Sequence, residues 1–362
     1  MAKRAYNFNA GPAALPLEVL EQAQAEFVDY KGIGMSIMEI SHRSKEYEQI
    51  NDETQELLKE LLGVPAGYKT LFLQGGASTQ FSMIPLNLLT PGRTAGYVAT
   101  GSWANKAIKE AKLIGEVAIA ASTEADGYRR MPKPSEIHVD DNWAYLHITS
   151  NETIGGVQFH EYPDTGKVPL IADMSSDILC RPIDVSKFSL IYAGAQKNLG
   201  PSGVTVVLAR EELLAESPKN VPTMLRYDTH AKANSLYNTP PAYSVYMVNL
   251  VLKWIKAKGG VAAIEQYNRE KTDLIYQAID NSGGFYKGLV DRDSRSIMNI
   301  TFAIEDEALE KQFLKEAQEA GFIGLKGHRE VGHMRASTYN AVPRESCAAL
   351  AEFMADFQRR NG

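Results

Sequence analysis

The stretch that decides the fold is Ala193-Gly194-Ala195-Gln196-Lys197-Asn198-Leu199-Gly200-Pro201-Ser202-Gly203, which directly follows the apolar run Leu190 to Tyr192. An apolar run of this length indicates a buried strand, and the small residues after it indicate a tight loop. A lysine that forms an imine must be desolvated and closely approached, and small neighbours allow both. A single loop lysine is usually solvated, but the neighbours of Lys197 favour the covalent role.

Six other short apolar runs alternate with helical segments along the chain. They are Leu71 to Leu73, Gly96 to Ala99, Val117 to Ala120, Tyr145 to Ile148, Leu170 to Ala172 and Val204 to Leu208. Alternating strands and helices predict an α/β fold with a mostly parallel sheet covered on both faces. Two amphipathic helices precede them, one with Leu20, Ala23 and Phe27 after Pro16, the other from Ile50 to Leu62 before Gly63.

The pattern changes after Pro240 and Pro241 to longer helical stretches with few strands. Helices are expected over Tyr243 to Ala257, Val261 to Asp280, Leu309 to Ala320 and from Pro343 onward, and strands over Ile297 to Ala303 and Arg335 to Tyr339. We therefore expect a large domain over residues 16–263 and a smaller α+β domain formed by residues 1–15 and 264–362. Gly259 and Gly260 mark either this boundary or only a helix break.

Composition restricts the class of protein. The 362 residues are 44% hydrophobic and 23% charged, which is enough to bury a core in two domains. A formal net charge of -6 argues against general binding to nucleic acid or anionic membranes. The cysteines, Cys180 and Cys347, have no metal-ligand spacing, so we expect no zinc site and a reduced, cytoplasmic setting. Neither a signal peptide nor an apolar membrane span is expected.

Polar residues follow two further predicted strands. The strand from Lys69 to Gln74 runs into Gly75-Gly76-Ala77-Ser78-Thr79, and a glycine turn at a helix start can present N–H groups to a phosphate. For this segment taken alone, an ordinary tight strand-to-helix turn is the simpler explanation. Asp173 ends another strand, where a carboxylate can keep a pyridine nitrogen protonated, although a helix-capping role is the simpler explanation for that residue alone.

Five motifs at strand ends occur in the order found in fold-type I pyridoxal-phosphate enzymes: Gly76-Ala77-Ser78, Gly101-Ser102-Trp103, Ser150-Asn151-Glu152-Thr153, Ala172-Asp173 and Gln196-Lys197. More narrowly, the chain resembles the phosphoserine aminotransferase family from about residue 6 to the C-terminus. The motifs that carry this resemblance are Asn7 to Pro12, Ser41-His42-Arg43-Ser44, Ala193 to Gly203, Tyr237 to Pro241 and Gly327-His328-Arg329.

The resemblance implies one pyridoxal 5'-phosphate per subunit. Lys197 would attach it, Asp173 would pair with its pyridine nitrogen, Trp103 would stack on its ring and Thr153 would hydrogen-bond its phenolic oxygen. Its phosphate would be held by Gly76, Ala77, Ser78 and Gln196, and by Asn238 and Thr239 of the second subunit. Sharing the site in this way implies an obligate homodimer. Taken alone, Trp103 is as easily a core aromatic and Thr153 a structural threonine.

Positive charge in three places is expected to bind the substrates. Guanidinium groups hold carboxylates and phosphates through paired, charge-assisted hydrogen bonds. The resemblance implies that Arg335 binds the α-carboxylate, while His42, Arg43, His328 and Arg329 hold the distal phosphate or the side-chain carboxylate of glutamate. A surface salt bridge is the simpler explanation for each arginine taken singly.

Two positions depart from the family pattern. Some members carry an arginine at the position of Ser78, which adds to phosphate binding, and a second glycine is expected at the position of His333. The departures leave open how the phosphate contact is distributed and what backbone conformation precedes Arg335.

The expected reaction interconverts 3-phosphohydroxypyruvate and L-glutamate with O-phospho-L-serine and 2-oxoglutarate, in serine biosynthesis. Whether an intermediate of pyridoxine biosynthesis is also a substrate stays open. A cysteine desulfurase would need a reactive cysteine on a mobile loop, and an alanine-glyoxylate type of aminotransferase would not need the second cationic cluster. A non-catalytic regulator would need an added DNA-binding segment, for which we expect no room before Asn7.

Overall fold

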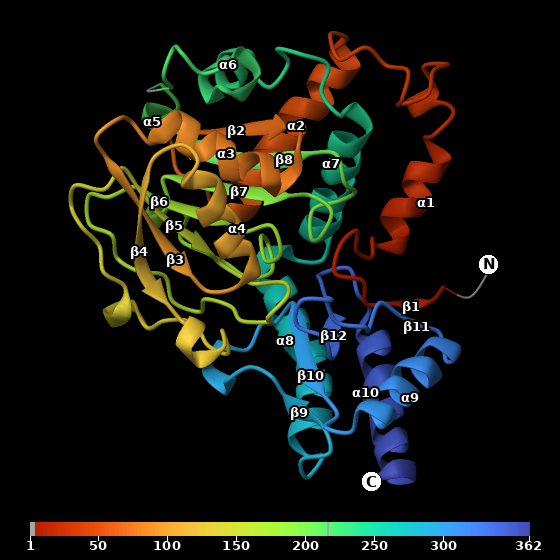
Figure 1. The fold of residues 1–362 in the computed structure, drawn as a ribbon. Coiled ribbons are helices and arrows are strands. Elements are labelled where there is room, and N and C mark those ends of the chain that lie inside the picture. Colours follow the sequence, from red (N-terminus) through yellow and green to blue (C-terminus); the bar gives the residue numbers. More distant parts are fainter. Residues whose placement is uncertain (1–3, 216) are drawn as a thin grey trace.

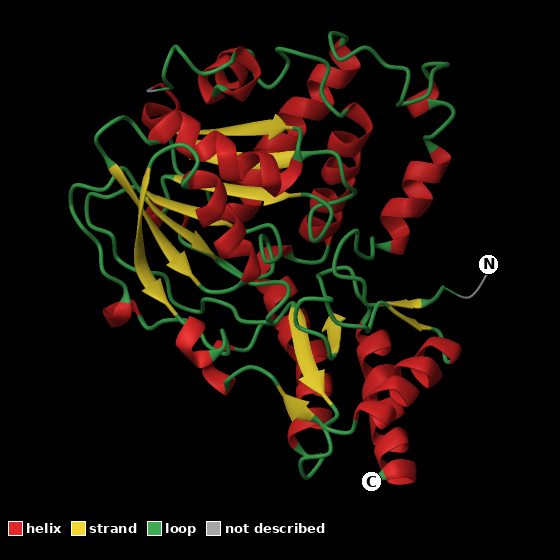
Figure 2. Ribbon diagram, in the orientation of Figure 1, coloured by secondary structure: helices red, strands yellow, loops and turns green. Residues whose placement is uncertain are grey.

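A seven-stranded sheet lies at the centre of the larger part of the molecule (Figures 1 and 2). The structure is a computed structural model that describes residues 4–215 and 217–362. The strands, in spatial order, are β2 (Tyr68–Leu73), β8 (Thr205–Arg210), β7 (Leu190–Gly194), β6 (Leu170–Asp173), β5 (Leu146–Thr149), β3 (Thr94–Ala99) and β4 (Glu116–Ser122). Each overlaps one of the predicted runs. β8 is antiparallel to both neighbours and the other pairings are parallel, so the mostly parallel α/β sheet is confirmed.

Helices cover both faces of this sheet because successive side chains of a strand point to opposite sides. In β2, Phe72 packs in one apolar cluster, while Leu71 and Leu73 pack in another. The first cluster receives α2 (Lys45–Leu62) and α7 (Ala242–Ala257), and the second receives α3 (Gly76–Leu88) and α4 (Ser102–Ala111). With water excluded from both faces, the strands need apolar residues at nearly every position, which explains their continuous apolar runs.

The remaining helices and strands complete the fold. They are α1 (Leu17–Ala25), α5 (Glu211–Ala215), α6 (Tyr227–Lys232), α8 (Gly260–Asp280), α9 (Glu307–Glu319), α10 (Arg344–Asn361), β1 (Tyr6–Asn7), β9 (Lys287–Gly288), β10 (Asn299–Ala303), β11 (Phe322–Ile323) and β12 (Met334–Ser337). In the order β12, β10, β9, three of them form an antiparallel sheet, and β1 pairs with β11. Of the described helices, none is long and apolar enough to cross a membrane.

A third apolar cluster lies between α8, α9, α10 and the small sheets, in the lower part of Figure 1. Helix α8 joins it to the rest of the molecule. Val261 and Ile264 of that helix pack in the cluster of α2 and α7, whereas Ile275 and Ile279 pack in the third cluster. The division after residue 263, which stays a prediction, thus falls within a continuous helix rather than in a linker.

Two helix ends differ from the expectation. Helix α2 begins at Lys45, before the predicted Ile50, where the Ser44 hydroxyl caps it by accepting a hydrogen bond from the Tyr47 N–H at 3.3 Å. It ends at Leu62, as predicted, and Gly63 follows with a φ of 62°. Helix α1, however, ends at Ala25, so Phe27 lies beyond it. The ring of Phe27 packs edge-on against Tyr243 with centroids 6.0 Å apart. This contact, rather than helical spacing, accounts for its apolar side chain.

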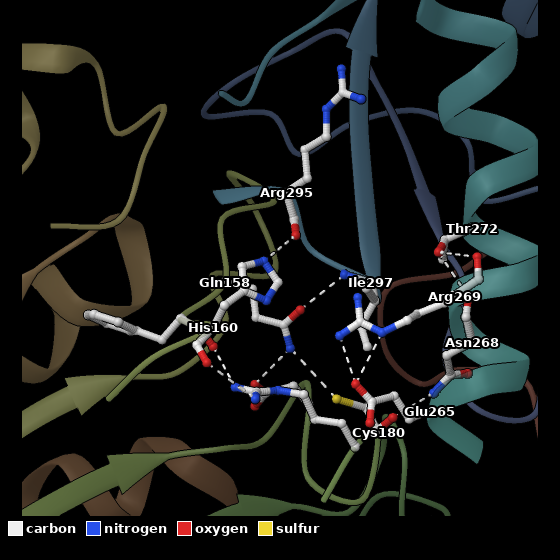
Figure 3. Close-up of polar contacts among 12 residues, drawn as sticks. Gln158, His160, Cys180, Glu265, Asn268, Arg269, Thr272, Arg295 and Ile297 are labelled. Carbon is white, nitrogen blue, oxygen red and sulfur yellow. Dashed lines mark hydrogen bonds and ion pairs between the residues drawn. The ribbon is translucent and has the colours of Figure 1, made fainter. Parts of the chain in front are cut away.

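Polar contacts join the loop after β5 to the segment before β10, and the loop after β6 to α8 (Figure 3). The Gln158 side chain accepts from the Ile297 N–H at 3.0 Å and lies 3.6 Å from the Cys180 sulfur. Asn268 of α8 donates to the Cys180 carbonyl at 3.0 Å, and a His160 ring nitrogen lies 3.0 Å from the Arg295 carbonyl oxygen. These contacts satisfy buried backbone groups where regular pairing ends, and they fix the two parts of the chain against each other.

Lys271 provides a test of such buried polar contacts. Its side chain is 0% exposed, and its ammonium nitrogen lies 2.6, 3.4 and 3.1 Å from the carbonyl oxygens of Tyr339, Asn340 and Val342. Lys271→Met removes the ammonium donor from all three carbonyls, although the Tyr339 carbonyl keeps the Val342 N–H at 2.9 Å. We expect the substitution to lower the free energy of unfolding by about 3 kcal/mol. Guanidinium unfolding followed by circular dichroism measures the change. The control, Lys256→Met, removes a surface pair with Glu60 and should cost less than about 1 kcal/mol; equal losses would contradict the prediction.

Candidate active site

A cavity of about 220 Å³ opens at the carboxyl ends of β5, β6 and β7, where ligands bind in open α/β sheets. Strand ends and helix starts supply its walls. The lining residues are Gly75, Gly76, Ala77, Ser78, Trp103, Thr149, Asn151, Thr153, Asp173, Ser175, Ser176, Gln196 and Lys197. The structure thus brings together eight residues that the sequence nominated for the cofactor, Gly76, Ala77, Ser78, Trp103, Thr153, Asp173, Gln196 and Lys197, while their individual roles stay predictions.

Lys197 is held by a compact turn after β7. The Gly200 N–H donates to the Ala195 carbonyl at 2.8 Å, which closes the turn. The N-terminal segment crosses over it, since a Cβ built on Gly11 would lie 3.4 Å from Lys197 Cγ. The lysine amine then donates to Thr153 Oγ1 at 2.6 Å. Small residues at these positions give the amine a fixed and sheltered place, as the sequence predicted.

The electrostatics of the cavity favour a lysine that changes charge near neutral pH. Burial lowers the pKa of Lys197 to about 8, although the charges of Asp173 and Glu152 act in the opposite direction and Arg335 adds to the lowering. Burial also raises the pKa of Asp173, against which Ser175, Lys197 and Tyr192 act. A proton on this amine is therefore exchanged more readily than on an exposed lysine, whose pKa is about 10.4.

The start of α3 forms one wall of the cavity. Gly75 and Gly76 have φ values of 89° and 66°, in the left-handed region that glycine adopts easily. A Cβ on Gly75 would also lie 2.0 Å from Thr79 Oγ1. The turn aims the first N–H groups of α3, which lack partners within the helix, at the cavity. The helix start can therefore bind a phosphate.

Glu152 is a functional residue that the sequence reasoning quoted within a motif but did not nominate. Its buried carboxylate accepts hydrogen bonds from the N–H groups of Trp103 at 3.1 Å and Ala104 at 2.9 Å. Gly101 makes room for it, since a Cβ there would lie 2.7 Å from Glu152 Cδ. Burial raises the pKa of Glu152 to about 7. Glu152 thus caps α4 and fixes Trp103. The amine of Lys106 lies 4.3 Å from the centroid of the Trp103 ring, and the amine of Lys197 lies 5.4 Å from it.

Arg335 reaches the same site from β12. One guanidinium nitrogen, Nη1, donates to the Thr153 carbonyl at 3.1 Å. The Nε–H is buried and has no hydrogen-bond partner within residues 4–215 and 217–362. An unpaired buried donor on a cation is unfavourable, so Arg335 keeps the capacity to donate one further hydrogen bond to an anion, although it does not itself line the cavity.

The remaining nominated residues do not line this cavity. Asn238 and Thr239 lie beside it, where the Asn238 amide donates to Gln74 Oε1 at 3.2 Å and Gln74 donates to the Thr239 carbonyl at 3.1 Å. Arg43 and Arg329 are exposed. Across the described residues, no hydrogen bond or ion pair links the loop of His42 to the loop of His328.

The two departures from the family pattern have different structural outcomes. Ser78 lies in the cavity wall on α3, where its short side chain adds no charge. His333 has a φ of 56°, so the backbone there adopts the left-handed conformation for which a glycine was expected. Its ring lies 3.1 Å from the Glu310 carboxylate, a contact that a glycine would not make.

The cavity has the groups that pyridoxal 5'-phosphate requires. The helix start of α3 with Gln196 suits a phosphate, Trp103 offers an aromatic face, and Asp173 places a buried carboxylate opposite Lys197. The Trp103 indole N–H is buried without a partner in the part of the chain that is described. The set of donors therefore fits this cofactor.

The lowered pKa of Lys197 is testable on the cofactor-free protein. Only a neutral amine reacts with acetic anhydride, so the labelling of Lys197, read by mass spectrometry, should rise with a midpoint at a pH of about 8. Arg335→Met removes a nearby cation and should raise the midpoint, and Asp173→Asn removes an anion and should lower it. Midpoints that do not respond to either substitution would refute this account of the site.

Known proteins match the chain over nearly its whole length. Residues 5–350 match the family described as aminotransferase class-V. The phosphoserine aminotransferase of Niallia circulans is 67% identical over 362 residues, covering 100% of each chain. The solved phosphoserine aminotransferase from Bacillus circulans subsp. alkalophilus superposes with a TM-score of 0.98 at 66% identity, covering 99% of both chains. The "PLP bound phosphoserine aminotransferase (PSAT)" of Trichomonas vaginalis gives 0.91 at 38% identity, covering 97% of this chain and 100% of that one. The chain therefore belongs to the class-V aminotransferases and, within them, to the phosphoserine aminotransferase family.

Proposed function

We propose that the chain transfers an amino group between L-glutamate and 3-phosphohydroxypyruvate, giving 2-oxoglutarate and O-phospho-L-serine in serine biosynthesis. Membership of the phosphoserine aminotransferase family, at 67% identity to the curated relative, supports this reaction. The observation that carries it is the sheltered Lys197 amine, which lies 2.6 Å from Thr153 while the Nε–H of Arg335 is left without a partner. One group moves a proton, and the other binds an anionic substrate next to it.

The enzyme uses pyridoxal 5'-phosphate, one per subunit. Lys197 would be its attachment point, and the phosphate would rest on Gly76, Ala77, Ser78 and Gln196 at the start of α3 and the turn after β7. Asp173 would hold the ring nitrogen, Trp103 would cover one face and Thr153 would bond the phenolic oxygen. When bound, the cofactor supplies an electron sink for the bonds at the substrate α-carbon.

Proton transfer at the substrate α-carbon would fall to the Lys197 amine. A general base works best when its pKa lies near the working pH, and burial brings the pKa of Lys197 to about 8. Thr153 keeps the amine oriented through its hydroxyl. Glu152 contributes indirectly, because its carboxylate holds the start of α4 and therefore Trp103 in place.

Cationic side chains of the protein would bind the two anionic ends of the substrate. Arg335 is suited to the α-carboxylate because its Nε–H has no partner within the described residues and its charge lies close enough to act on the Lys197 amine. His328 and Arg329 would bind the distal phosphate or carboxylate. Their loop is tied to α4 by Glu330, whose carboxylate lies 3.9 Å from the Lys106 amine.

A homodimer would complete the site. His42, Arg43, Asn238 and Thr239 do not line the cavity of their own chain. The chain just before His42 carries a series of exposed apolar side chains, Phe27, Val28, Ile33, Met35 and Met38, of which Val28 is 79% and Met38 60% exposed. Surfaces of this kind are unfavourable in water and are typical of interfaces. A second copy covering these side chains would carry His42 and Arg43 to the partner's cavity.

The rival enzyme, a cysteine desulfurase, needs an exposed and ionisable thiol. Cys180 and Cys347 are both 0% exposed, and burial raises the pKa of each thiol, that of Cys347 to about 12. The buried thiols therefore favour the aminotransferase. Unpaired cysteines, together with small soluble substrates, also support a cytoplasmic location.

The apolar clusters support a domain division close to the predicted one, although Ile264 packs with the large domain. Residues 16–263 would form the large cofactor domain, and residues 1–15 and 264–362 the small domain. Pairing of β1 with β11 and the packing of Phe8 in the third apolar cluster support assigning the N-terminal segment to the small domain.

Lys197→Ala should abolish transamination and the visible absorption of the protein-bound cofactor, because the attachment point and the proton carrier are both lost. The fold, followed by circular dichroism, should stay intact. The control is Lys187→Ala, which changes an exposed lysine of the same region and should keep full activity. A Lys197→Ala protein that still turned over would exclude the proposed mechanism.

Mixing variants tests whether the site is shared. Arg43→Ala should raise the Michaelis constant for phosphoserine at least about tenfold, since a charge-assisted hydrogen bond to the phosphate is lost. In an equal mixture of Arg43→Ala and Lys197→Ala subunits, about half of the dimers are mixed. If Arg43 serves the partner's site, each mixed dimer contains one intact site out of two, so about a quarter of the wild-type activity should return at low substrate concentration. Arg329→Ala mixed with Lys197→Ala should return none, because Arg329 is expected to serve its own chain. No recovery in the first mixture would place Arg43 outside the partner's site.

A further inference from the structure

A buried polar chain lies behind Asp173, on the side away from the cavity opening. Tyr192, on β7, is the register partner of Asp173 on β6, and His147 lies on β5, the next strand. A ring nitrogen of His147, Nε2, lies 2.9 Å from the Tyr192 hydroxyl oxygen. The Tyr192 side chain also lies next to Asp173, whose carboxylate raises the pKa of the Tyr192 hydroxyl while that hydroxyl acts to lower the pKa of the carboxylate. Three neighbouring strands thus contribute one side chain each to a continuous path that ends at Asp173.

The direction of these hydrogen bonds follows from the number of protons available. Burial and the Asp173 charge raise the pKa of Tyr192, so its hydroxyl keeps its proton and donates it to the carboxylate. The Tyr192 oxygen must then accept from His147, which requires the proton of the neutral imidazole to be on Nε2. Consistent with that tautomer, Nδ1 of His147 is buried and has no partner in the described chain. Burial lowers the pKa of His147 to about 3, which keeps the ring neutral.

Neighbouring tyrosines provide a comparison in the same apolar cluster. The hydroxyls of Tyr97 and Tyr145 lie 2.8 Å apart, and the Tyr227 hydroxyl donates to Gln80 Oε1 at 2.6 Å. Within the described chain, neither pair hydrogen-bonds to a residue that lines the cavity, and the two members of each pair satisfy each other. The ring of Tyr97 stacks on His147 with centroids 4.9 Å apart, which fixes the imidazole orientation. Of these hydroxyls, that of Tyr192 is directed to a residue of the cavity.

We propose that Tyr192 and His147 are positioning residues that act through Asp173: the chain of donors His147 to Tyr192 to Asp173 orients this carboxylate and keeps it ionised, so that it can hold a protonated cofactor ring nitrogen. The inference rests on the proposed function, because it assigns a purpose to the ring-nitrogen contact of Asp173. A carboxylate buried away from water loses the hydration that stabilises its charge, and a donor on its far side replaces part of that hydration. Without this donor the carboxylate would keep the Ser175 N–H at 2.9 Å and the nearby charge of Lys197, but its negative charge would be less stable and its pairing with a pyridinium weaker.

The experiment measures protonation of the ring nitrogen directly. The apoprotein is loaded with pyridoxal phosphate labelled with ¹⁵N in the ring, and the ¹⁵N chemical shift distinguishes the protonated from the unprotonated ring. The wild type should show the protonated ring. Tyr192→Phe should move the shift toward the unprotonated value and weaken pyridoxal phosphate binding about tenfold, while the affinity for the 1-deaza analogue, which lacks the ring nitrogen, changes less than about twofold.

Tyr145→Phe is the matched control, because it removes an equally buried hydroxyl that does not contact Asp173. It should leave the chemical shift and both affinities unchanged. If Tyr192→Phe does not fold, as judged by circular dichroism, His147→Leu replaces it, with a shift in the same direction and an affinity loss of about threefold. A wild-type shift and affinity in whichever of these variants folds would overturn the inference.

The design separates this inference from the function on which it rests. A wild-type protein that holds the ring unprotonated, or that does not bind pyridoxal phosphate, would overturn the proposed function and the inference together. A second outcome is that the ring is protonated in the wild type, loses this protonation in Asp173→Asn and keeps it in Tyr192→Phe. The proposed function would then stand, and only the role of Tyr192 and His147 would be rejected. Parallel losses for pyridoxal phosphate and its 1-deaza analogue would also reject it, since a general loosening of the cavity affects both.

Discussion

The site depends on burying opposite charges together at the carboxyl ends of neighbouring strands. Lys197 and Asp173 both lie where little water reaches, and burial shifts the pKa of each toward its neutral form. Neither ion would be favourable there alone, but each opposes the shift of the other. The balance leaves an amine with a pKa of about 8 instead of a permanently charged lysine. The sheet is essential to this arrangement, because parallel strands deliver their last residues to one edge.

Close approach of the backbone is the second requirement. Glycine at positions 75 and 101 lets α3 and α4 begin directly at the cavity, where a side chain would collide with Thr79 or Glu152. The first N–H groups of α3 then remain available to an anion, while those of α4 are taken by the Glu152 carboxylate. Two similar strand-to-helix turns therefore serve different purposes: one can bind a ligand and the other holds an aromatic ring.

The predictions from sequence succeeded where the pattern is local. Continuous apolar runs identified the seven strands of the large sheet, since strands covered on both faces need apolar residues throughout. The loop of small residues around Lys197 and the carboxylate at the end of β6 were also identifiable, because each directly follows one of these apolar runs. The sequence could not predict that α1 stops before Phe27, because the ring that Phe27 packs against belongs to Tyr243, more than two hundred residues later. Nor did it single out Glu152, whose partners are the N–H groups at the start of α4.

The sequence by itself therefore determined the family, the order of strands and helices along the chain, and the residue types available to the site. Tertiary structure decided which of them meet: Arg335 with the Thr153 carbonyl, Glu152 with the start of α4, and His147 with Tyr192 behind Asp173. It also separated His42 and Arg43 from the cavity of their own chain. The physical reason is that periodicity and propensity report the local exposure of a segment. Contacts between distant residues depend on strand register and on the path of the connecting loops, which a single sequence does not display.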